Sequence, residues 1–145
     1  MKIRKFRKKD SDVCSKIIYD CVFFARKLGE KEKKFLKDFY APQKIAEISR
    51  VSDFFVAQKN KKVVGTGRLK GEKIATLYVD PKYQRNGIGT LIINYLIKRA
   101  RRKNLGKVYV ESLLQSVSFY EKKGFKKTKA LKKPVRALKM EKKLK

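Results

Sequence analysis

The 145-residue sequence contains no histidine and no tryptophan, and it has only 13 acidic residues against 41 lysines and arginines. Without histidine, the chain has no histidine general base, no Ser-His triad and no histidine-ligated metal. Its two cysteines, Cys14 and Cys21, stand seven residues apart in a helical pattern. This spacing predicts two small core residues on one helix face, and it favours neither a disulfide nor a metal site.

Long apolar runs are also missing. No segment approaches the ~20 apolar residues of a membrane-spanning helix. No apolar stretch follows the basic N-terminal sequence MKIRKFRKKD, as it would in a secretory signal. We therefore expect no membrane span and no signal peptide, and a reducing cytoplasm is the expected compartment.

The excess of basic residues gives a formal net charge of +28. Such a field favours anionic partners: nucleotides, nucleic acid, acidic peptides or anionic lipid. The alternative is a compositional background of lysine with no partner attached to it. A hydrophobic content of 42% with 11% aromatics excludes a disordered chain. We expect one domain over residues 1–145.

The N-terminal third is mostly helical in pattern. KIRKFR, at residues 2–7, predicts a first strand. Apolar residues then recur at helical spacing as far as Leu28, and Gly29 ends the run. Residues 31–51 predict one or two short helices, broken near Pro42.

From Asp53 the pattern changes to that of strands. DFFVAQ and VVGTGRL flank the turn KNKK, and KIATLYV at 73–79 follows a second turn, so three antiparallel strands are expected. An amphipathic helix from Ile88 follows, and then the strand KVYVES at 107–112, parallel to 73–79 if the crossover is right-handed. A short helix ending at Gly124 and a hairpin around Pro134 complete the chain.

The stretch VDPKYQRNGIGT, at residues 79–90, places Gly87 and Gly89 between a strand and the long helix. Backbone N–H groups at a helix N-terminus bind anions, and glycine lets a ligand approach the backbone. The stretch matches neither a P-loop nor a three-glycine dinucleotide fingerprint. The remaining pattern is Q-x-x-G-x-G from Gln84 to Gly89, which taken alone is more typical of a tight turn.

The order of motifs resembles the GNAT superfamily of acyl-CoA-dependent N-acetyltransferases over essentially the whole chain. The resemblance is carried by LYVDPKYQRNGIGT, the helix after it, the strand KVYVES, and SFYEKKGF at residues 118–125. It implies an α+β fold with three α/β/α layers. The mixed, mostly antiparallel sheet would be splayed between the fourth and fifth strands.

The resemblance also implies a site for acetyl-CoA and no metal. Pantetheine would lie in the V-shaped slot between strands 73–79 and 107–112, and the pyrophosphate would lie on the amides of residues 85–90. Arg85 would add a charge-assisted contact or remain a solvated loop residue. Gln115 stands where many relatives have asparagine. The implied cofactor-binding residues are Leu77, Tyr78, Val79, Gln84, Arg85, Asn86, Gly87, Ile88, Gly89, Thr90, Gln115 and Tyr120.

Acetyl transfer needs a polarised carbonyl, a base for the amine and an acid for the thiolate. By resemblance, a backbone N–H near Val79 polarises the carbonyl and Tyr120 is the acid, with a packing role for Tyr120 as the alternative. The position where some relatives carry a carboxylate is Lys73 here. Glu72 is one residue off and faces the other side of the sheet. Glu111 is the better base candidate, and a water relay is the remaining option.

The leading function is therefore an N-acetyltransferase that acts on a primary amine of a protein N-terminus, a lysine or a small molecule. The alternative is a GNAT-fold protein that binds nucleic acid or the ribosome through its charge. A polyamine acceptor is disfavoured because it would be repelled. Residues 30–52 are expected to line the acceptor side, but they carry no motif that names the acceptor.

Overall fold

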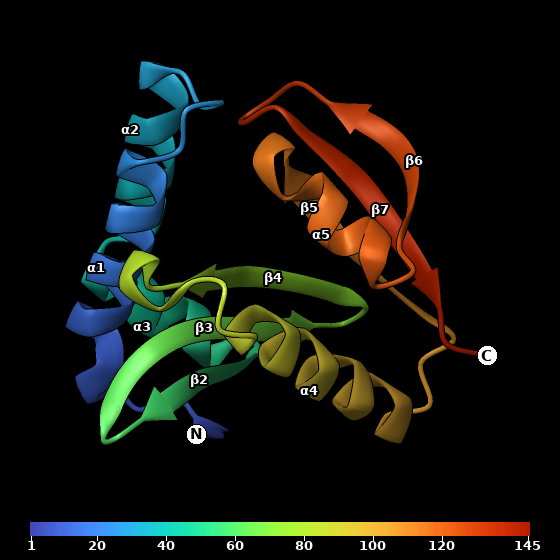
Figure 1. Ribbon diagram of the computed structural model, residues 1–145, viewed down its shortest axis with the longest axis horizontal. Coiled ribbons are helices and arrows are strands. Elements are labelled where there is room, and N and C mark those ends of the chain that lie inside the picture. The colour runs from blue at the N-terminus through green and yellow to red at the C-terminus, as the bar shows by residue number, and fades with distance from the viewer.

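A seven-stranded mixed sheet, in the order β1-β2-β3-β4-β5-β7-β6, forms the middle of the computed structural model, which describes residues 1–145 (Figure 1). The strands are β1 (Lys2–Lys5), β2 (Asp53–Lys59), β3 (Lys62–Lys70), β4 (Lys73–Val79), β5 (Lys107–Leu113), β6 (Lys126–Leu131) and β7 (Ala137–Lys143). The helices are α1 (Ser11–Phe23), α2 (Glu30–Phe39), α3 (Pro42–Arg50), α4 (Ile88–Arg102) and α5 (Val117–Lys122). No helix combines the length and hydrophobicity that crossing a membrane requires.

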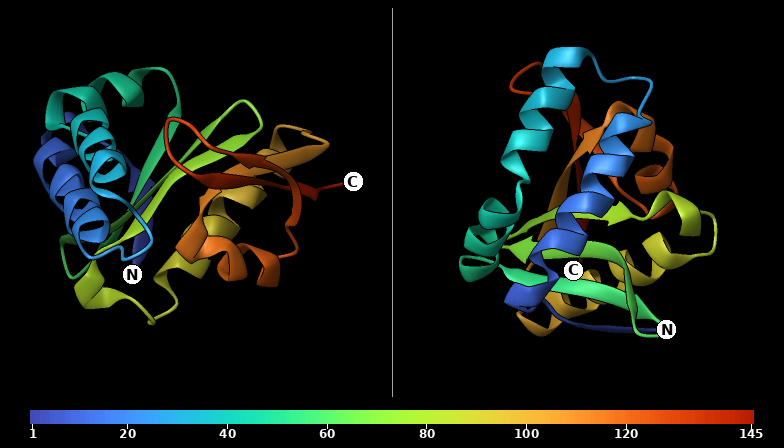
Figure 2. Two further views of the ribbon diagram at one scale, coloured as in Figure 1. Left: turned by 90° about the horizontal axis from the view of Figure 1, so that it is seen from above. Right: turned by 90° about the vertical axis from the view of Figure 1, so that its left-hand side faces the viewer.

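The helices cover both faces of the sheet. Figure 2 shows α1, α2 and α3 on one face and α4 and α5 on the other. Two apolar clusters match these layers. One packs α4 and α5 against the sheet and includes Ile92 and Phe125. The other packs α1, α2 and α3 against the opposite face and includes Ile18 and Ile45. The prediction of a three-layer α+β fold is therefore confirmed.

The sheet separates between β4 and β5, as predicted. These two parallel strands share a single register pair, Lys73 with Tyr109, and the Tyr109 N–H donates to the Glu72 carbonyl over 2.9 Å. Beyond this point the β4 edge that faces β5 has no strand partner, while its other edge pairs with β3 as far as Val79. Figure 1 shows β4 and the β5–β7 pair diverging from this junction.

Strand β4 also carries a bulge. The β3–β4 register shifts between Thr66 and Arg68, and opposite this shift Thr76 has a φ of 57°. A positive φ is costly for a β-branched residue and persists only where its surroundings hold it. Thr66 Oγ1 donates to the Thr76 carbonyl over 2.6 Å, and the Thr76 hydroxyl lies within hydrogen-bond distance of two further side chains described below.

Helix α4 lies close against β3 because β3 presents glycine there. A Cβ at Gly67 would lie 2.5 Å from Ile92 Cγ2 and 3.0 Å from Leu96 Cδ1. Real Cβ atoms do not approach carbon this closely, so only glycine accepts the helix at this distance. The N-terminus of α4 is thereby fixed relative to the end of β4.

Two details differ from the sequence prediction. Helix α1 ends at Phe23, and residues 24–29 form turns, although apolar residues continue at helical spacing to Leu28. Ala25 and Leu28 are still buried, so the apolar spacing beyond Phe23 results from the burial of these turns and not from a longer helix. Cys14 lies in the core as predicted, but Cys21 is only partly buried and borders the site described next.

Candidate active site

A cleft of about 1330 Å³ lies between the two diverging halves of the sheet. Its floor comes from β4 and β5 with Arg68 of β3, one wall from α1 and α2, and the other wall from α5 and the β6–β7 hairpin. Ligand pockets usually measure roughly 300–1,000 Å³. The cleft here is larger than this range.

One end of the cleft is a loop whose backbone is shaped for an anion. Arg85 and Gly87 both have positive φ, 67° and 77°, and Gly87 is the N-cap of α4. The first bond within this helix runs from the Leu91 N–H to the Gly87 carbonyl at 3.0 Å, so the N–H groups of residues 88–90 have no partner inside the helix. Free N–H groups and the positive end of the helix dipole together favour a phosphate.

The end of β4 is tied to this loop through the Val79 carbonyl. It accepts hydrogen bonds from Gln84 Nε2 at 3.0 Å and from Cys21 Sγ at 3.1 Å. Burial raises the pKa of the Cys21 thiol to about 12, so the thiol keeps its proton at neutral pH. Gln84 thus holds the loop to the strand, and Cys21 joins α1 to the same point.

Gly89 borders the slot between Val79 and Phe119. A Cβ added at Gly89 would lie 3.5 Å from the Phe119 ring and 3.8 Å from Val79 Cγ2, both ordinary contact distances. A Cβ added at Gly87 would meet nothing within 4 Å. The chain's own packing therefore leaves room at both glycines, and that room lies along the path expected for a bound cofactor.

Tyr120 lies in α5, with its ring packed on Phe119 and Phe125 at centroid distances of 5.2 and 5.5 Å. The residue is 8% exposed, and no hydrogen bond joins its hydroxyl to another protein atom. Because no fully buried polar side-chain atom lacks a partner, this hydroxyl reaches the open space of the cleft. Burial raises the pKa of this hydroxyl above its ordinary value, and nearby Tyr40 contributes in the same direction. Tyr120 therefore holds its proton firmly and has no protein acceptor for it.

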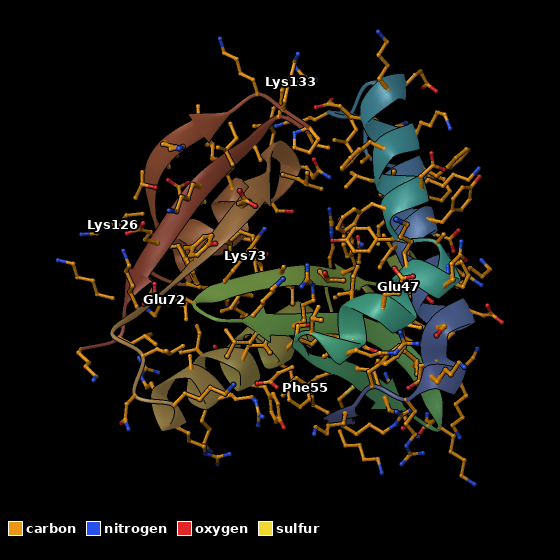
Figure 3. The ribbon with its side chains drawn as sticks, turned by 180° about the vertical axis from the view of Figure 1, so that it is seen from behind. Glu47, Phe55, Glu72, Lys73, Lys126 and Lys133 are labelled. Carbon is orange, nitrogen blue, oxygen red and sulfur yellow. The ribbon has the colours of Figure 1, made fainter.

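Glu111 lies on β5 and forms an ion pair with Lys73 of β4, across the junction where the sheet opens. Figure 3 shows Lys73 between the two halves of the molecule, with Lys133 above it at the β6–β7 tip. The contact joins Lys73 Nζ to Glu111 Oε1, and both residues line the cleft. Glu72 lies in the turn before β4 and does not line the cleft.

The structure brings most of the expected site residues to this cleft. Asn86 is the exception, because it is exposed on the loop and does not line the cavity. The residues that do line it are Leu77, Tyr78, Val79, Gln84, Arg85, Gly87, Ile88, Gly89, Thr90, Glu111, Gln115 and Tyr120.

Sequence reasoning missed a polar group on the cleft floor, formed by Tyr40, Arg68 and Thr76. Arg68 Nε donates to Thr76 Oγ1 over 2.8 Å, and the Tyr40 hydroxyl lies 3.2 Å from the same oxygen. One signal was present: Arg68 is the only charged residue inside the run VVGTGRL. A charge within a buried strand is uncommon unless it has a specific role.

The sequence matches the acetyltransferase (GNAT) domain family over residues 24–144, and the chain therefore belongs to this family. Among curated proteins, it is 30% identical over 73 residues to GCN5-related N-acetyltransferase 2, chloroplastic, of Arabidopsis thaliana. That match covers 47% of this chain and 28% of the relative's length.

Solved structures agree on the fold. A GCN5-related N-acetyltransferase (Aminotransferase, Class-II) of Rhodopseudomonas palustris is similar with a TM-score of 0.91 and 22% identity, over 99% of this chain and 95% of that one. The PaiA N-acetyltransferase of Thermoplasma acidophilum, in complex with coenzyme A, gives 0.81 and 20% identity over 98% of both chains. At these identities the likeness shows the shared fold.

Proposed function

We propose that this protein is an N-acetyltransferase that passes the acetyl group of acetyl-CoA directly to a primary amine. The observation that carries the proposal is the cleft itself. It opens where β4 and β5 part. At one end lie the unpaired N–H groups of the first turn of α4, and the hydroxyl of Tyr120, a largely buried residue, borders the cleft.

The residues present fit acetyl-CoA, as the open space at Gly87 and Gly89 indicates. We assign the pyrophosphate to the N–H groups of residues 85–90 and the pantetheine to residues 77–79, on the edge of β4 that has no strand partner. Gln115 lies on the opposite side of the slot, in the short helical turn Leu114–Ser116 after β5. When bound, acetyl-CoA supplies an activated acetyl thioester, and the chain supplies orientation and proton transfer.

Proton transfer divides between the two sides of the cleft. Tyr120 is placed to give its proton to the departing sulfur, since it is protonated and has no protein acceptor. Glu111 is placed to receive the proton of the amine, directly or through water, because it lines the cleft on β5. Lys73 would hold that carboxylate in position across the slot.

Direct transfer follows from the lack of an activated nucleophile at the cleft. Cys21 is the only cysteine that lines it, and its thiol has a pKa of about 12 and donates to the Val79 carbonyl. A thiol in that state is a poor nucleophile. The serines at the cleft have no histidine to activate them. Initial-rate plots against both substrates should therefore intersect, and parallel lines would indicate an acetyl-enzyme instead.

The test of the proposal is cofactor binding together with thiol release. Calorimetry should show one acetyl-CoA site per chain, and Gly89→Val should weaken binding tenfold or more because its side chain enters the slot. Gly89 has ordinary helical backbone geometry, whereas Gly87 has a positive φ, so Gly89 tests the ligand without backbone strain. Gly106→Val is the control, because nothing lies within 4 Å of its added Cβ. Equal affinity in all three proteins would refute the assignment.

The alternative, binding of nucleic acid or the ribosome through the basic surface, has less support. Three of the exposed lysines, Lys126, Lys127 and Lys129, lie on β6, the edge strand. Lysines on an edge strand prevent pairing with other chains, which gives these residues a role of their own. We therefore keep the enzyme as the proposed function and expect any polyanion binding to weaken steeply as salt rises.

A further inference from the structure

Arg68 is a cation on the floor of the cleft, within strand β3. It is 8% exposed, and in the strand it follows Gly67 and precedes buried Leu69. Its side chain faces the side of the sheet that α1, α2 and α3 cover. There it donates a hydrogen bond to Thr76, whose hydroxyl also contacts Tyr40 at the C-terminus of α2. The side chain borders the cavity together with Thr76 and Tyr40.

Arg68 has no negative partner in the protein. Its Nε donates to Thr76 Oγ1 over 2.8 Å, and no carboxylate forms an ion pair with its guanidinium. A guanidinium has five N–H donors, so four remain after this bond. No fully buried side-chain nitrogen or oxygen in the structure lacks a partner. The terminal nitrogens of Arg68 therefore reach the open space of the cleft and are not sealed in the core.

The other cation on the floor differs in this respect. Lys73 is paired with Glu111, so its charge is compensated within the protein. Holding an unpaired charge away from bulk water costs free energy, and a protein recovers that cost when a ligand supplies the opposite charge. A planar guanidinium with two free nitrogens matches a carboxylate through two parallel hydrogen bonds.

We infer that Arg68 binds a carboxylate of the acceptor, so that the substrate is an amine that also carries a carboxylate. This inference rests on the proposed acetyltransferase function. Thr76, which holds Arg68, precedes Val79 by three residues on β4, or about 10 Å at the rise of an extended strand. A carboxylate on Arg68 would thus lie within the span of one amino-acid-sized molecule from the point of acetyl transfer.

The carboxylate could be that of a free amino acid or an acidic side chain of a polypeptide. Both use the same chemistry at Arg68, and the substrate panel separates them. It contains alanine, phenylalanine and lysine, their C-terminal amides, and hexapeptide amides with aspartate or asparagine at the second position. Thiol release from acetyl-CoA is measured for each.

In the wild type we expect kcat/KM for each free amino acid to exceed that of its amide about 10- to 100-fold, the range expected from loss of a hydrogen-bonded charge. If the source is a polypeptide, the same preference should separate the aspartate peptide from the asparagine peptide. Arg68→Met should abolish the preference through KM, and Arg68→Lys should restore part of it. Arg50→Met, at an exposed position on α3, should leave it unchanged.

The ratio of kcat/KM for the free acid to kcat/KM for its amide is measured within each protein. A smaller fraction of folded enzyme lowers both values equally and leaves this ratio unchanged. Calorimetric binding of N-acetylalanine and its amide to the CoA-saturated protein gives the same ratio without turnover. Equal rates for acids and amides in the wild type, or a preference that survives Arg68→Met, would overturn the inference and leave the acetyltransferase intact. Failure to bind acetyl-CoA or to acetylate any amine would instead overturn the proposed function.

Discussion

Tyr120 combines two properties that a proton donor needs. Its hydroxyl is held in place by the packing of its ring, and burial raises its pKa above the ordinary ~10, so that it is protonated throughout the neutral range. The chain has no histidine to replace it. The remaining question at this residue is whether the hydroxyl acts on sulfur or the ring only packs.

Tyr120→Phe separates these roles because it keeps the ring and removes the proton. We expect acetyl-CoA affinity to change little and turnover to fall about 10²-fold, within the range of general acid catalysis. Because the pKa is raised, deprotonation of Tyr120 should lower the wild-type kcat only above about pH 10, and the Phe variant should lack this decline. Steady-state rates against pH, with calorimetry for affinity, provide the measurement. Full turnover in the variant would make Tyr120 a packing residue.

Some residues of the site could be predicted from the sequence and others could not, and the reason is physical. The residues from Gln84 to Thr90 are contiguous, so a strand end, two glycines and a helix start were enough to place an anion site there. Tyr40, Arg68 and Thr76 come from three elements and meet only because β4 bulges against β3. Nothing in the local sequence of any one of them specifies that meeting.

Among the elements, α4 has the greatest influence on the site, because its first turn supplies the free N–H groups. Its position depends on the two strand glycines Gly65 and Gly67, which let Ile92 approach β3. The sequence predicted both the helix and the strand from their periodicities. It did not predict their distance, since a glycine in a strand is equally typical of a bulge or of a close approach.

Gly67→Ala should therefore destabilise the fold. Its Cβ would lie 2.5 Å from Ile92 Cγ2, a branched methyl with little freedom to move, and overpacking of this kind costs about 1–3 kcal/mol. Gly106→Ala adds the same methyl group where nothing lies within 4 Å and should change the stability by less than about 0.5 kcal/mol. Urea unfolding of the three proteins measures both effects. Equal stability of the two variants would show that α4 shifts without cost.

Over the whole molecule, polar contacts join the two sides of the cleft in two regions, in addition to the apolar core that the sides share. One is the β4–β5 junction at Lys73 and Tyr109. The other lies across the mouth of the cleft, where Glu32 of α2 accepts from the Arg136 backbone N–H at 2.7 Å and from its Nη2 at 3.1 Å. Figure 1 shows the loop before α2 and the tip of the β6–β7 hairpin approaching each other at this point.

The Glu32–Arg136 contact should make stability depend on pH in acid. Hydrogen bonds from the Arg136 side chain, the Arg136 backbone and Gly29 lower the pKa of Glu32 from 4.5 to about 2. A carboxyl whose pKa is lower in the folded state stabilises that state above its unfolded pKa, and the effect disappears as pH falls through the folded pKa. The contribution of Glu32 should thus be complete above about pH 4.5 and lost toward pH 2.

Glu32→Gln should accordingly be less stable than the wild type at pH 7, and the difference should shrink steadily between pH 4.5 and 2. Glu30→Gln is the matched control. It removes the same charge from the same first turn of α2, where Glu30 is exposed and has no ion pair, so it reports only the interaction with the helix dipole. Denaturant unfolding at pH 7, 4 and 2.5 measures all three proteins. Two outcomes would show that the contact does not hold the two sides of the cleft together. One is a stability difference between Glu32→Gln and the wild type that is the same at every pH. The other is an equal loss of stability in Glu32→Gln and Glu30→Gln.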